Sequence, residues 1–212
     1  MMRPRTTTSR TAAALAATLA LVAVPVTSAT AAEPAPAPAT TSAAAAAGVD
    51  YDLWRQDVAA VAAEARPWLE SRTGNAGAEK QAIVLDIDNT ALETHFHPLW
   101  VQPVPAVADV RELARFADSR GVAVFFVTAR PDIVRDLTEW NLEKAGYPVD
   151  GLYVRDLPDI FDDAAPYKTA ARAGIEAKGY TIIANIGNNA SDLAGGHAER
   201  TFKLPDYDGK LF

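Results

Sequence analysis

Short, uninterrupted apolar runs alternate along this chain with longer segments of helical periodicity, and this alternation limits the folds that are open to it. The runs at 82–86, 122–127, 151–154 and 181–186 are as short and apolar as strands buried on both faces. Strands that alternate with helices form parallel sheets through right-handed crossovers. We therefore expect an α/β fold, a doubly wound, Rossmann-like parallel sheet with helices on both faces.

The intervening segments have apolar residues at three- and four-residue spacing, which predicts helices at 50–71, from Pro105 to about 120, at 131–144 and at 166–178. We expect the first helix to pack in the core, although a helix there could also cover the site. The residues expected to be buried are Trp54, Val58, Val61, Ala65 and Trp68 in the first helix, and Ile133, Val134, Leu137 and Trp140 in the third.

The N-terminal segment has the pattern of a secretory signal peptide over residues 1–31. Its only charged residues are arginines, an apolar stretch spans 12–26, and Ala29-Thr-Ala31 offers a cleavage site. An uncleaved membrane anchor is the alternative, but the stretch is shorter than the roughly 20 residues that a membrane helix needs. Residues 32–49 are an Ala/Pro-rich linker, so we expect a secreted, extracellular domain at 50–212 with no membrane anchor after processing.

Composition excludes several classes of function. The 212-residue chain has a net charge of −7, and residues 1–31 carry three arginines, so their removal would give −7 − 3 = −10. So acidic a domain argues against non-specific nucleic-acid binding, which needs clustered cations. The chain has no cysteine, which excludes disulfides, zinc–thiolate sites and thiol catalysis.

Polar side chains lie just beyond the carboxyl ends of the predicted strands. Ligands bind at these ends in doubly wound sheets. Asp86 and Asp88 follow the first run, Thr128 ends the second, and Asp192 comes shortly after the last. Two such close carboxylates repel each other unless a cation lies between them or one holds a proton. A divalent ion with oxygen ligands, such as Mg²⁺, would remove this repulsion.

Each of these residues also has an ordinary structural explanation. Asp86-x-Asp88-Asn could form a turn, Thr128 could cap a helix, and Asp192 could stabilise a helix N-terminus. Lys168, in the first turn of its predicted helix, could be a surface lysine. Together, however, these residues supply the nucleophile, proton donor, metal site and cation that phosphoryl transfer requires.

Four motifs resemble those of the haloacid dehalogenase (HAD) superfamily of phosphatases, in the branch of secreted bacterial acid phosphatases and plant vegetative storage proteins. They are the D-x-D-x-T-like LDIDNT (85–90), VTAR (127–130), YKTAAR (167–172) and the run from Gly179 to Leu193. Their order and spacing agree over 50–204. Only 37 residues (91–127) separate Thr90 from Thr128, so we expect a HAD-type fold without a large cap domain and an open site for small phosphomonoesters.

The resemblance implies a role for each residue. Asp86 would attack phosphorus and form an aspartyl-phosphate, and Asp88 would protonate the leaving alcohol and then activate water. Thr128 and Lys168 would hold the phosphoryl oxygens. The implied Mg²⁺ ligands are Asp86, the backbone carbonyl of Asp88, Asn188 and, through a water or in the outer sphere, Asp192.

One implied ligand departs from the family pattern. The family usually has Gly-Asp where this chain has Gly187-Asn188, and an amide oxygen can bind a metal but carries no charge. A secreted binding or storage protein with little turnover is therefore an alternative. A phospho-accepting receiver domain is another, although export and Asp88 argue against it.

The histidines allow a second hypothesis. His95 and His97 would share a face of an extended segment and could bind a metal, although a carboxylate site already stands nearby. We expect 94–101 to form a loop over the site, with Phe96 or Trp100 contacting the leaving group. Ordinary packing of these rings is the alternative.

Overall fold

A five-stranded parallel sheet forms the centre of the computed structural model, which describes residues 48–74, 77, 79–98 and 100–211. The strand order is β3-β2-β1-β4-β5, and every pair is parallel. The expected doubly wound α/β fold is confirmed, with a fifth strand that the sequence did not indicate. The strands are β1 (Lys80–Leu85), β2 (Ala123–Pro131), β3 (Gly151–Arg155), β4 (Tyr180–Gly187) and β5 (Thr201–Lys203).

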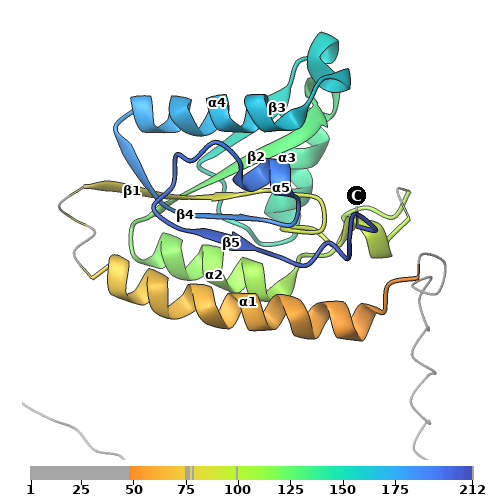
Figure 1. Ribbon diagram of the computed structural model, residues 1–212, viewed down its shortest axis with the longest axis horizontal. Coiled ribbons are helices and arrows are strands. Elements are labelled where there is room, and N and C mark those ends of the chain that lie inside the picture. The colour runs from red at the N-terminus through yellow and green to blue at the C-terminus, as the bar shows by residue number, and fades with distance from the viewer. Residues whose placement is uncertain (1–47, 75–76, 78, 99, 212) are drawn as a thin grey trace, which may run out of the picture. The chain divides into compact units, whose positions relative to one another are not determined.

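Helices cover both faces of the sheet (Figure 1). The helices α1 (Tyr51–Arg72) and α2 (Ala108–Ser119) lie on one face, and α4 (Ala164–Ala177) lies on the other. The larger apolar cluster includes Trp54 of α1 and Leu113 of α2, and the smaller one includes Ile175 of α4. The remaining helices are α3 (Arg135–Lys144), α5 (Ala190–Leu193) and the 3-10 helices η3 (Thr94–Phe96), η4 (Asp132–Val134) and η5 (Leu157–Phe161).

The first helix packs against the core as its periodicity predicts. Asp50 caps α1 by accepting a hydrogen bond from the backbone N–H of Leu53. Trp54, Val58 and Ala65 are fully buried. Val61 and Trp68 are only partly buried, and the indole Nε1–H of Trp68 reaches the carbonyl of Ile183 at 2.9 Å. This contact fastens the helix to β4.

The predicted starts of the second and fourth helices were wrong. The second helix begins at Ala108, not Pro105, because Ala106 pairs with Leu92 and the Pro105 carbonyl accepts the N–H of Glu93. The fourth begins at Ala164, two residues before Pro166. These residues are helical because Asp163 caps the helix by accepting a hydrogen bond from the N–H of Ala165.

The third helix buries a different face from the one that was predicted. Strand β2 continues to Pro131, η4 follows, and α3 begins only at Arg135. The side chains expected in the core are largely exposed: Ile133 by 75%, Leu137 by 49% and Trp140 by 38%. The helix instead buries Thr138, Asn141 and Leu142. The expected apolar face is therefore wrong, because two polar side chains of α3 hold neighbouring segments.

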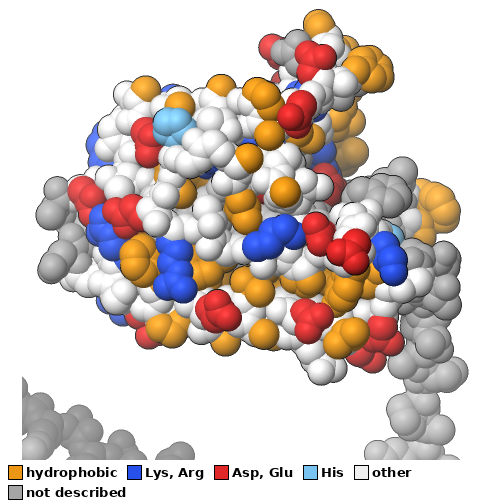
Figure 2. Space-filling view, viewed as in Figure 1, with side chains coloured by type: hydrophobic (Ala, Val, Ile, Leu, Met, Phe, Trp, Pro, Cys, Tyr) orange, Lys and Arg blue, Asp and Glu red, His pale blue; other side chains and the backbone are white. Residues whose placement is uncertain are grey.

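The segments beyond the carboxyl ends of the strands are short. Between β1 and α2 the described residues form η3, turns and two isolated bridges, which leaves no room there for a large cap domain. No helix within the described ranges is long and apolar enough to cross a membrane. On the face drawn in Figure 2, Lys and Arg side chains lie beside Asp and Glu and form no continuous basic surface.

Candidate active site

The register of the sheet brings the predicted residues to one edge. Leu85, the last residue of β1, pairs with Phe126 of β2 and with Ile186 of β4. The backbone N–H of Asp86 donates to the Ile186 carbonyl at 3.0 Å. Asp86 therefore leaves the sheet between Thr128, in the last part of β2, and Asn188, just after β4.

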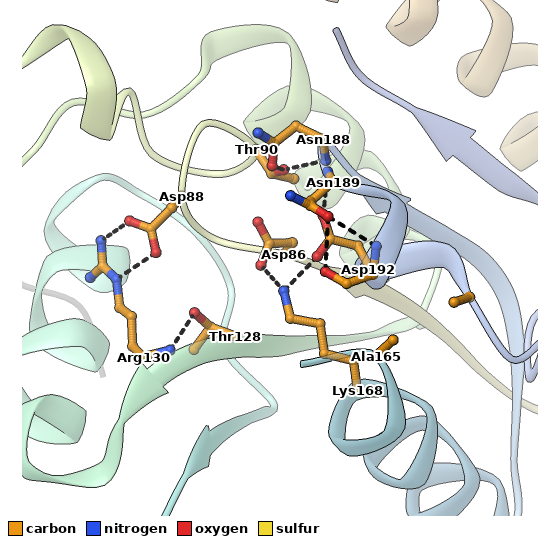
Figure 3. Close-up of polar contacts among 12 residues, drawn as sticks. Asp86, Asp88, Thr90, Thr128, Arg130, Ala165, Lys168, Asn188, Asn189 and Asp192 are labelled. Carbon is orange, nitrogen blue, oxygen red and sulfur yellow. Dashed lines mark hydrogen bonds and ion pairs between the residues drawn. The ribbon is translucent and has the colours of Figure 1, made fainter. Parts of the chain in front are cut away.

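Lys168 joins two carboxylates in the interior of this edge (Figure 3). Its Nζ lies 2.7 Å from Asp86 Oδ1 and 2.5 Å from Asp192 Oδ1. All three side chains are buried, so the surface-lysine alternative is wrong. Lys168 supplies one positive charge, and Asp86 and Asp192 supply two negative charges when both are ionised. The cluster then has a net charge of −1.

The protonation of this cluster reflects its burial. Burial raises the pKa of Asp86, and the charges of Asp192 and Asp88 raise it further, against the opposing effect of Lys168. Burial alone would lower the pKa of Lys168, but its two carboxylate partners raise it above its usual value. The lysine is therefore charged, and an additional cation would favour the ionised form of Asp86.

Asp192 is held in place by the short helix α5. Its Oδ2 accepts the backbone N–H of Asn189 at 2.7 Å, and Asn189 in turn caps the helix by accepting the N–H of Ser191. Asp192 therefore serves both as a helix-capping partner and as a partner of Lys168. The close approach depends on Gly187, since a Cβ added there would overlap the Asp192 side chain.

Asp88 lies half-buried and paired with an arginine. Arg130 Nη2 donates to Asp88 Oδ1 at 2.7 Å, and Arg130 Nε donates to Oδ2 at 3.0 Å. Figure 3 shows the Asp88 carboxylate pointing toward Arg130 and away from Asp86. Burial acts to raise the pKa of Asp88, but the guanidinium outweighs it and lowers the pKa.

Asn188 is fixed by partners on both sides of its amide. The hydroxyl of Thr90 donates to Asn188 Oδ1 at 3.2 Å and accepts the Asn188 backbone N–H at 3.0 Å. The side-chain Nδ2 donates to the carbonyl of Leu211 at 3.2 Å. The amide oxygen has a second lone pair, so it can still bind a metal in this orientation.

The loop expected over the site is anchored to the first helix. Phe96 is buried and packs against Tyr51 and Trp54, with ring centroids 4.9 and 4.6 Å apart. This is ordinary packing and not contact with a leaving group. Trp100, by contrast, is 84% exposed.

The two loop histidines have separate surroundings. His97 Nε2 lies 3.2 Å from Glu93 Oε2, and the His95 backbone N–H donates to Asn89 Oδ1 at 2.7 Å. Burial lowers the pKa of His95. Within the described ranges, His, Cys, Asp and Glu form no cluster of three that could hold a metal, so the histidine metal site is without support in this part of the chain.

Arg130 and Thr90 also lie in the site, where they contact Asp88 and Asn188, although no role was predicted for them. The VTAR motif (127–130) contained a signal for Arg130. Arg130 is two residues beyond Thr128, and alternate residues of an extended strand share a face. The signal for Thr90 was its place in the first motif, although its partner Asn188 lies 98 residues away in the sequence.

Comparisons with known proteins identify the family of this chain. Residues 98–210, just over half of the chain, match the acid phosphatase family, subfamily IIIB of the HAD superfamily. The chain belongs to this family, as its motifs indicated. The matched segment contains Thr128, Lys168, Asn188 and Asp192 but begins after Asp86 and Asp88. The sheet register brings those two aspartates to the same edge.

Several plant proteins are similar to this chain. The stem 28 kDa and 31 kDa glycoproteins of Glycine max are 38% identical to it over 113 residues, which are 50% of this chain and 44% and 39% of those proteins. Acid phosphatase 1 of Solanum lycopersicum is 32% identical over 111 residues, with 50% of this chain and 44% of that protein covered. The chain thus matches less than half the length of each.

A solved structure shares the fold. The class C acid phosphatase from Bacillus anthracis, determined with tungstate bound, superposes with a TM-score of 0.57 at 16% sequence identity. The match covers 74% of this chain and 80% of the other. At this identity the likeness supports the HAD-type fold.

Proposed function

We propose that this protein is a phosphomonoesterase that hydrolyses phosphate monoesters through an aspartyl-phosphate on Asp86. The observation that carries this proposal is the buried contact between Lys168 and Asp86 at the carboxyl end of β1, 2.7 Å long. The lysine binds Oδ1 and fixes the carboxylate, so that Oδ2 is the oxygen available for attack. Family membership supports the same reaction class.

The reaction proceeds in two displacements. Asp86 Oδ2 forms a bond to phosphorus while the bond from phosphorus to the alcohol oxygen breaks, and Asp88 gives its proton to that oxygen. Asp88 then takes a proton from water, whose oxygen attacks phosphorus and releases phosphate from Asp86. Lys168 and the hydroxyl of Thr128 bind the phosphoryl oxygens on which negative charge accumulates. Asp88 must turn from Arg130 toward the leaving oxygen for both proton transfers.

The residues of the site fit Mg²⁺ in their chemistry. The donors would be the carboxylate of Asp86, the amide oxygen of Asn188 and the backbone carbonyl of Asp88, which are oxygen ligands of the kind that Mg²⁺ prefers. Asp192 would act through a water or in the outer sphere. The excess negative charge around Lys168 favours a cation. When bound, Mg²⁺ would neutralise charge on the phosphoryl group.

We also propose that the protein is exported. The pattern of residues 1–31 supports a signal peptide and that of 32–49 a linker, and residues 1–47 lie outside the described part of the structure. N-terminal sequencing of the exported protein should find a start near Ala32. Retention of Met1 in the exported protein would contradict the proposal.

A phosphatase-like binding or storage protein with little turnover is a second candidate, because Asn188 lacks the charge of the aspartate usual in the family. Turnover separates the two candidates. The purified protein should release phosphate from a generic phosphomonoester with Mg²⁺, and removal of Mg²⁺ by a chelator should reduce the rate strongly. A folded protein with no phosphate release would favour the second candidate.

Substitution of the nucleophile tests the mechanism. Asp86→Asn should abolish turnover, because the nearly isosteric amide cannot form the aspartyl-phosphate. Asp132→Asn is the control, since Asp132 is an exposed carboxylate paired with Arg135 on the segment that follows β2. Undiminished activity in folded Asp86→Asn protein would rule out the assigned nucleophile.

A further inference from the structure

Helix α3 has its polar and apolar side chains in the reverse of the usual arrangement. Thr138 and Asn141 are 1% exposed, whereas Leu137 is 49% and Trp140 is 38% exposed on the same helix. Leu137 also lines a pocket beside Asp88, and an apolar side chain exposed in a pocket at a site points to binding.

The buried polar residues of α3 position the two walls of a pocket. The hydroxyl of Thr138 accepts a hydrogen bond from Arg130 Nη1 at 3.3 Å. The amide of Asn141 accepts the N–H of Val104 and donates to its carbonyl, both at 2.9 Å. The helix thus fixes Arg130 on one side and the loop before α2 on the other.

Between these walls lies a pocket of about 290 Å³ that opens beside Asp88. Val104, Val134 and Leu137 form an apolar wall, and Thr94, Gln102 and Thr138 add polar groups to the lining. Asp88 and Arg130 also line the pocket and are joined by paired hydrogen bonds. The pocket therefore has an apolar wall close to the carboxylate that would protonate the leaving oxygen.

We infer that this pocket receives the alcohol part of the substrate and that its apolar wall favours leaving groups with an alkyl chain. The inference rests on the proposed function, because it takes Asp88 as the group that protonates the leaving oxygen. An oxygen within reach of Asp88 carries its substituent into the space that Asp88 lines. That space is the pocket, and its Val and Leu side chains fit an alkyl chain.

Hydration distinguishes the leaving groups within this pocket. A polyhydroxylated alcohol loses hydrogen bonds to water against Val104, Val134 and Leu137, whereas an alkyl chain has none to lose. The polar groups of Thr94, Gln102 and Thr138 offset part of this loss.

The size of the selectivity follows from apolar burial. Each buried methylene contributes about 0.8 kcal/mol, which corresponds to roughly a fourfold gain in kcat/KM. The gain should continue along an alkyl series until the pocket is filled. Alcohols of the n-alkyl series have similar acidity, so the chemical step stays nearly constant while the buried area grows.

The experiment measures kcat/KM for ethyl, butyl and hexyl phosphate and for glycerol phosphate with the full-length protein. We expect at least a tenfold rise from ethyl to hexyl phosphate, and glycerol phosphate well below butyl phosphate. Val134→Thr and Leu137→Asn should each reduce the ratio of hexyl to ethyl phosphate. Ile133→Thr is the matched control, because Ile133 is exposed on η4 and does not line the pocket, and it should leave the ratio unchanged.

Calorimetric binding of ethyl-, butyl- and hexylphosphonate gives a second readout that does not depend on turnover, because the C–P bond is not hydrolysed. Affinity should rise along the series in the unsubstituted protein and less so in Leu137→Asn. Turnover of all esters with no dependence on chain length would overturn the pocket assignment and leave the phosphatase function intact. If no ester is turned over, the proposed function fails, and the phosphonate series alone decides on the pocket: a rising affinity supports it and a flat series overturns it.

Discussion

Arg130 donates two hydrogen bonds to the carboxylate of Asp88, of 2.7 and 3.0 Å, in the paired geometry that favours an ionised acid. Asp88 is also the residue that must carry a proton to the leaving alcohol. The arginine therefore lowers the fraction of Asp88 that holds a proton before the first transfer. It makes that proton easier to donate, and it weakens Asp88 as the base of the second transfer. Arg130 is a positioning residue whose effect can be measured through pH.

Arg130→Gln should shift the pH dependence of the enzyme. Without the guanidinium, burial is opposed only by the smaller effects of Thr94 and Lys168, so the pKa of Asp88 rises. Since protonated Asp88 is the acid, the basic limb of kcat/KM for an alkyl phosphate should move to higher pH. An aryl phosphate, whose leaving group needs little protonation, should show a smaller shift.

Arg135→Gln provides the control for this prediction. Arg135 forms an exposed ion pair with Asp132 at 2.9 Å and donates to the carbonyl of Leu152, so its removal changes the local charge without touching Asp88. The basic limb should stay where it is in Arg135→Gln. An unshifted profile in Arg130→Gln would show that Asp88 is not the acid in the rate-limiting step.

The central strands could be predicted because a strand that is buried on both faces is a short, nearly uninterrupted apolar run in the sequence. The runs that became β1 and β4 are nearly all Ala, Ile, Val and Leu, and the motifs at their ends give the site. Strand β5 escaped prediction because Thr201–Lys203 has only three residues, with Phe202 alone buried. Such a short strand is stabilised by its pairing with β4. Its three residues are too few to show a recognisable strand pattern in the sequence.

The orientation of α3 could not be predicted for a different reason. Its apolar residues recur at helical spacing, and this pattern normally marks the buried face. The buried face instead contains Thr138 and Asn141, whose partners are Arg130, at the end of the preceding strand, and Val104, 37 residues earlier than Asn141. Such tertiary hydrogen bonds leave no signal in the local sequence, so the pocket beside Asp88 was not foreseen either.

Gly187→Ala should reduce activity severely while the sheet remains folded. An added methyl group would overlap the Asp192 side chain and push it from Lys168 and from the N-terminus of α5. The displacement removes one of the two carboxylates that orient the lysine. A loss of roughly 100-fold in kcat/KM is expected for a misplacement of about 1 Å in a site of this kind.

Gly174→Ala is the matched substitution for this comparison. Gly174 lies inside α4, and a methyl group added there would meet no atom within 4 Å. The change should stabilise the protein by about 0.5–1 kcal/mol, since alanine is the better helix former, and should leave activity unchanged. Full activity in Gly187→Ala would show that the position of Asp192 is not critical.

Lys168→Gln should destabilise the fold as well as abolish turnover. The substitution leaves the buried carboxylates of Asp86 and Asp192 without a cation, and breaking a buried ion pair in this way costs about 3–5 kcal/mol. Urea unfolding should detect the loss. Lys178→Gln, at an exposed lysine that donates to Tyr153, should change stability by less than about 0.5 kcal/mol. Equal stability of the two variants would argue against a charged cluster.

Asn188→Asp tests the residue at which the chain departs from its family. If Asn188 faces the metal, the new carboxylate adds a full negative charge to the oxygen donors. A charge-assisted contact of about 1–3 kcal/mol would tighten Mg²⁺ binding by roughly 5- to 150-fold. The Mg²⁺ concentration for half-maximal activity should fall accordingly.

The same substitution should weaken the fold in the absence of metal. The Nδ2 of Asn188 donates to the Leu211 carbonyl at 3.2 Å, and a carboxylate would place a second acceptor there. Thr90 can still donate to the new oxygen. The thermal midpoint without Mg²⁺ should therefore drop, and saturating Mg²⁺ should recover more stability in Asn188→Asp than in the unsubstituted protein.

Asn189→Asp separates a specific ligand from a general charge effect. This variant should retain the capping of α5, since aspartate caps a helix as well as asparagine does, while adding the same charge one residue away. A fall in the Mg²⁺ midpoint confined to Asn188→Asp would identify position 188 as a ligand. If the added charge at position 188 instead repels the substrate phosphate, the maximal rate falls. A titration of Mg²⁺ distinguishes this effect from a change in affinity, because it gives the maximal rate and the Mg²⁺ midpoint separately. An unchanged Mg²⁺ midpoint in Asn188→Asp would remove Asn188 from the metal site.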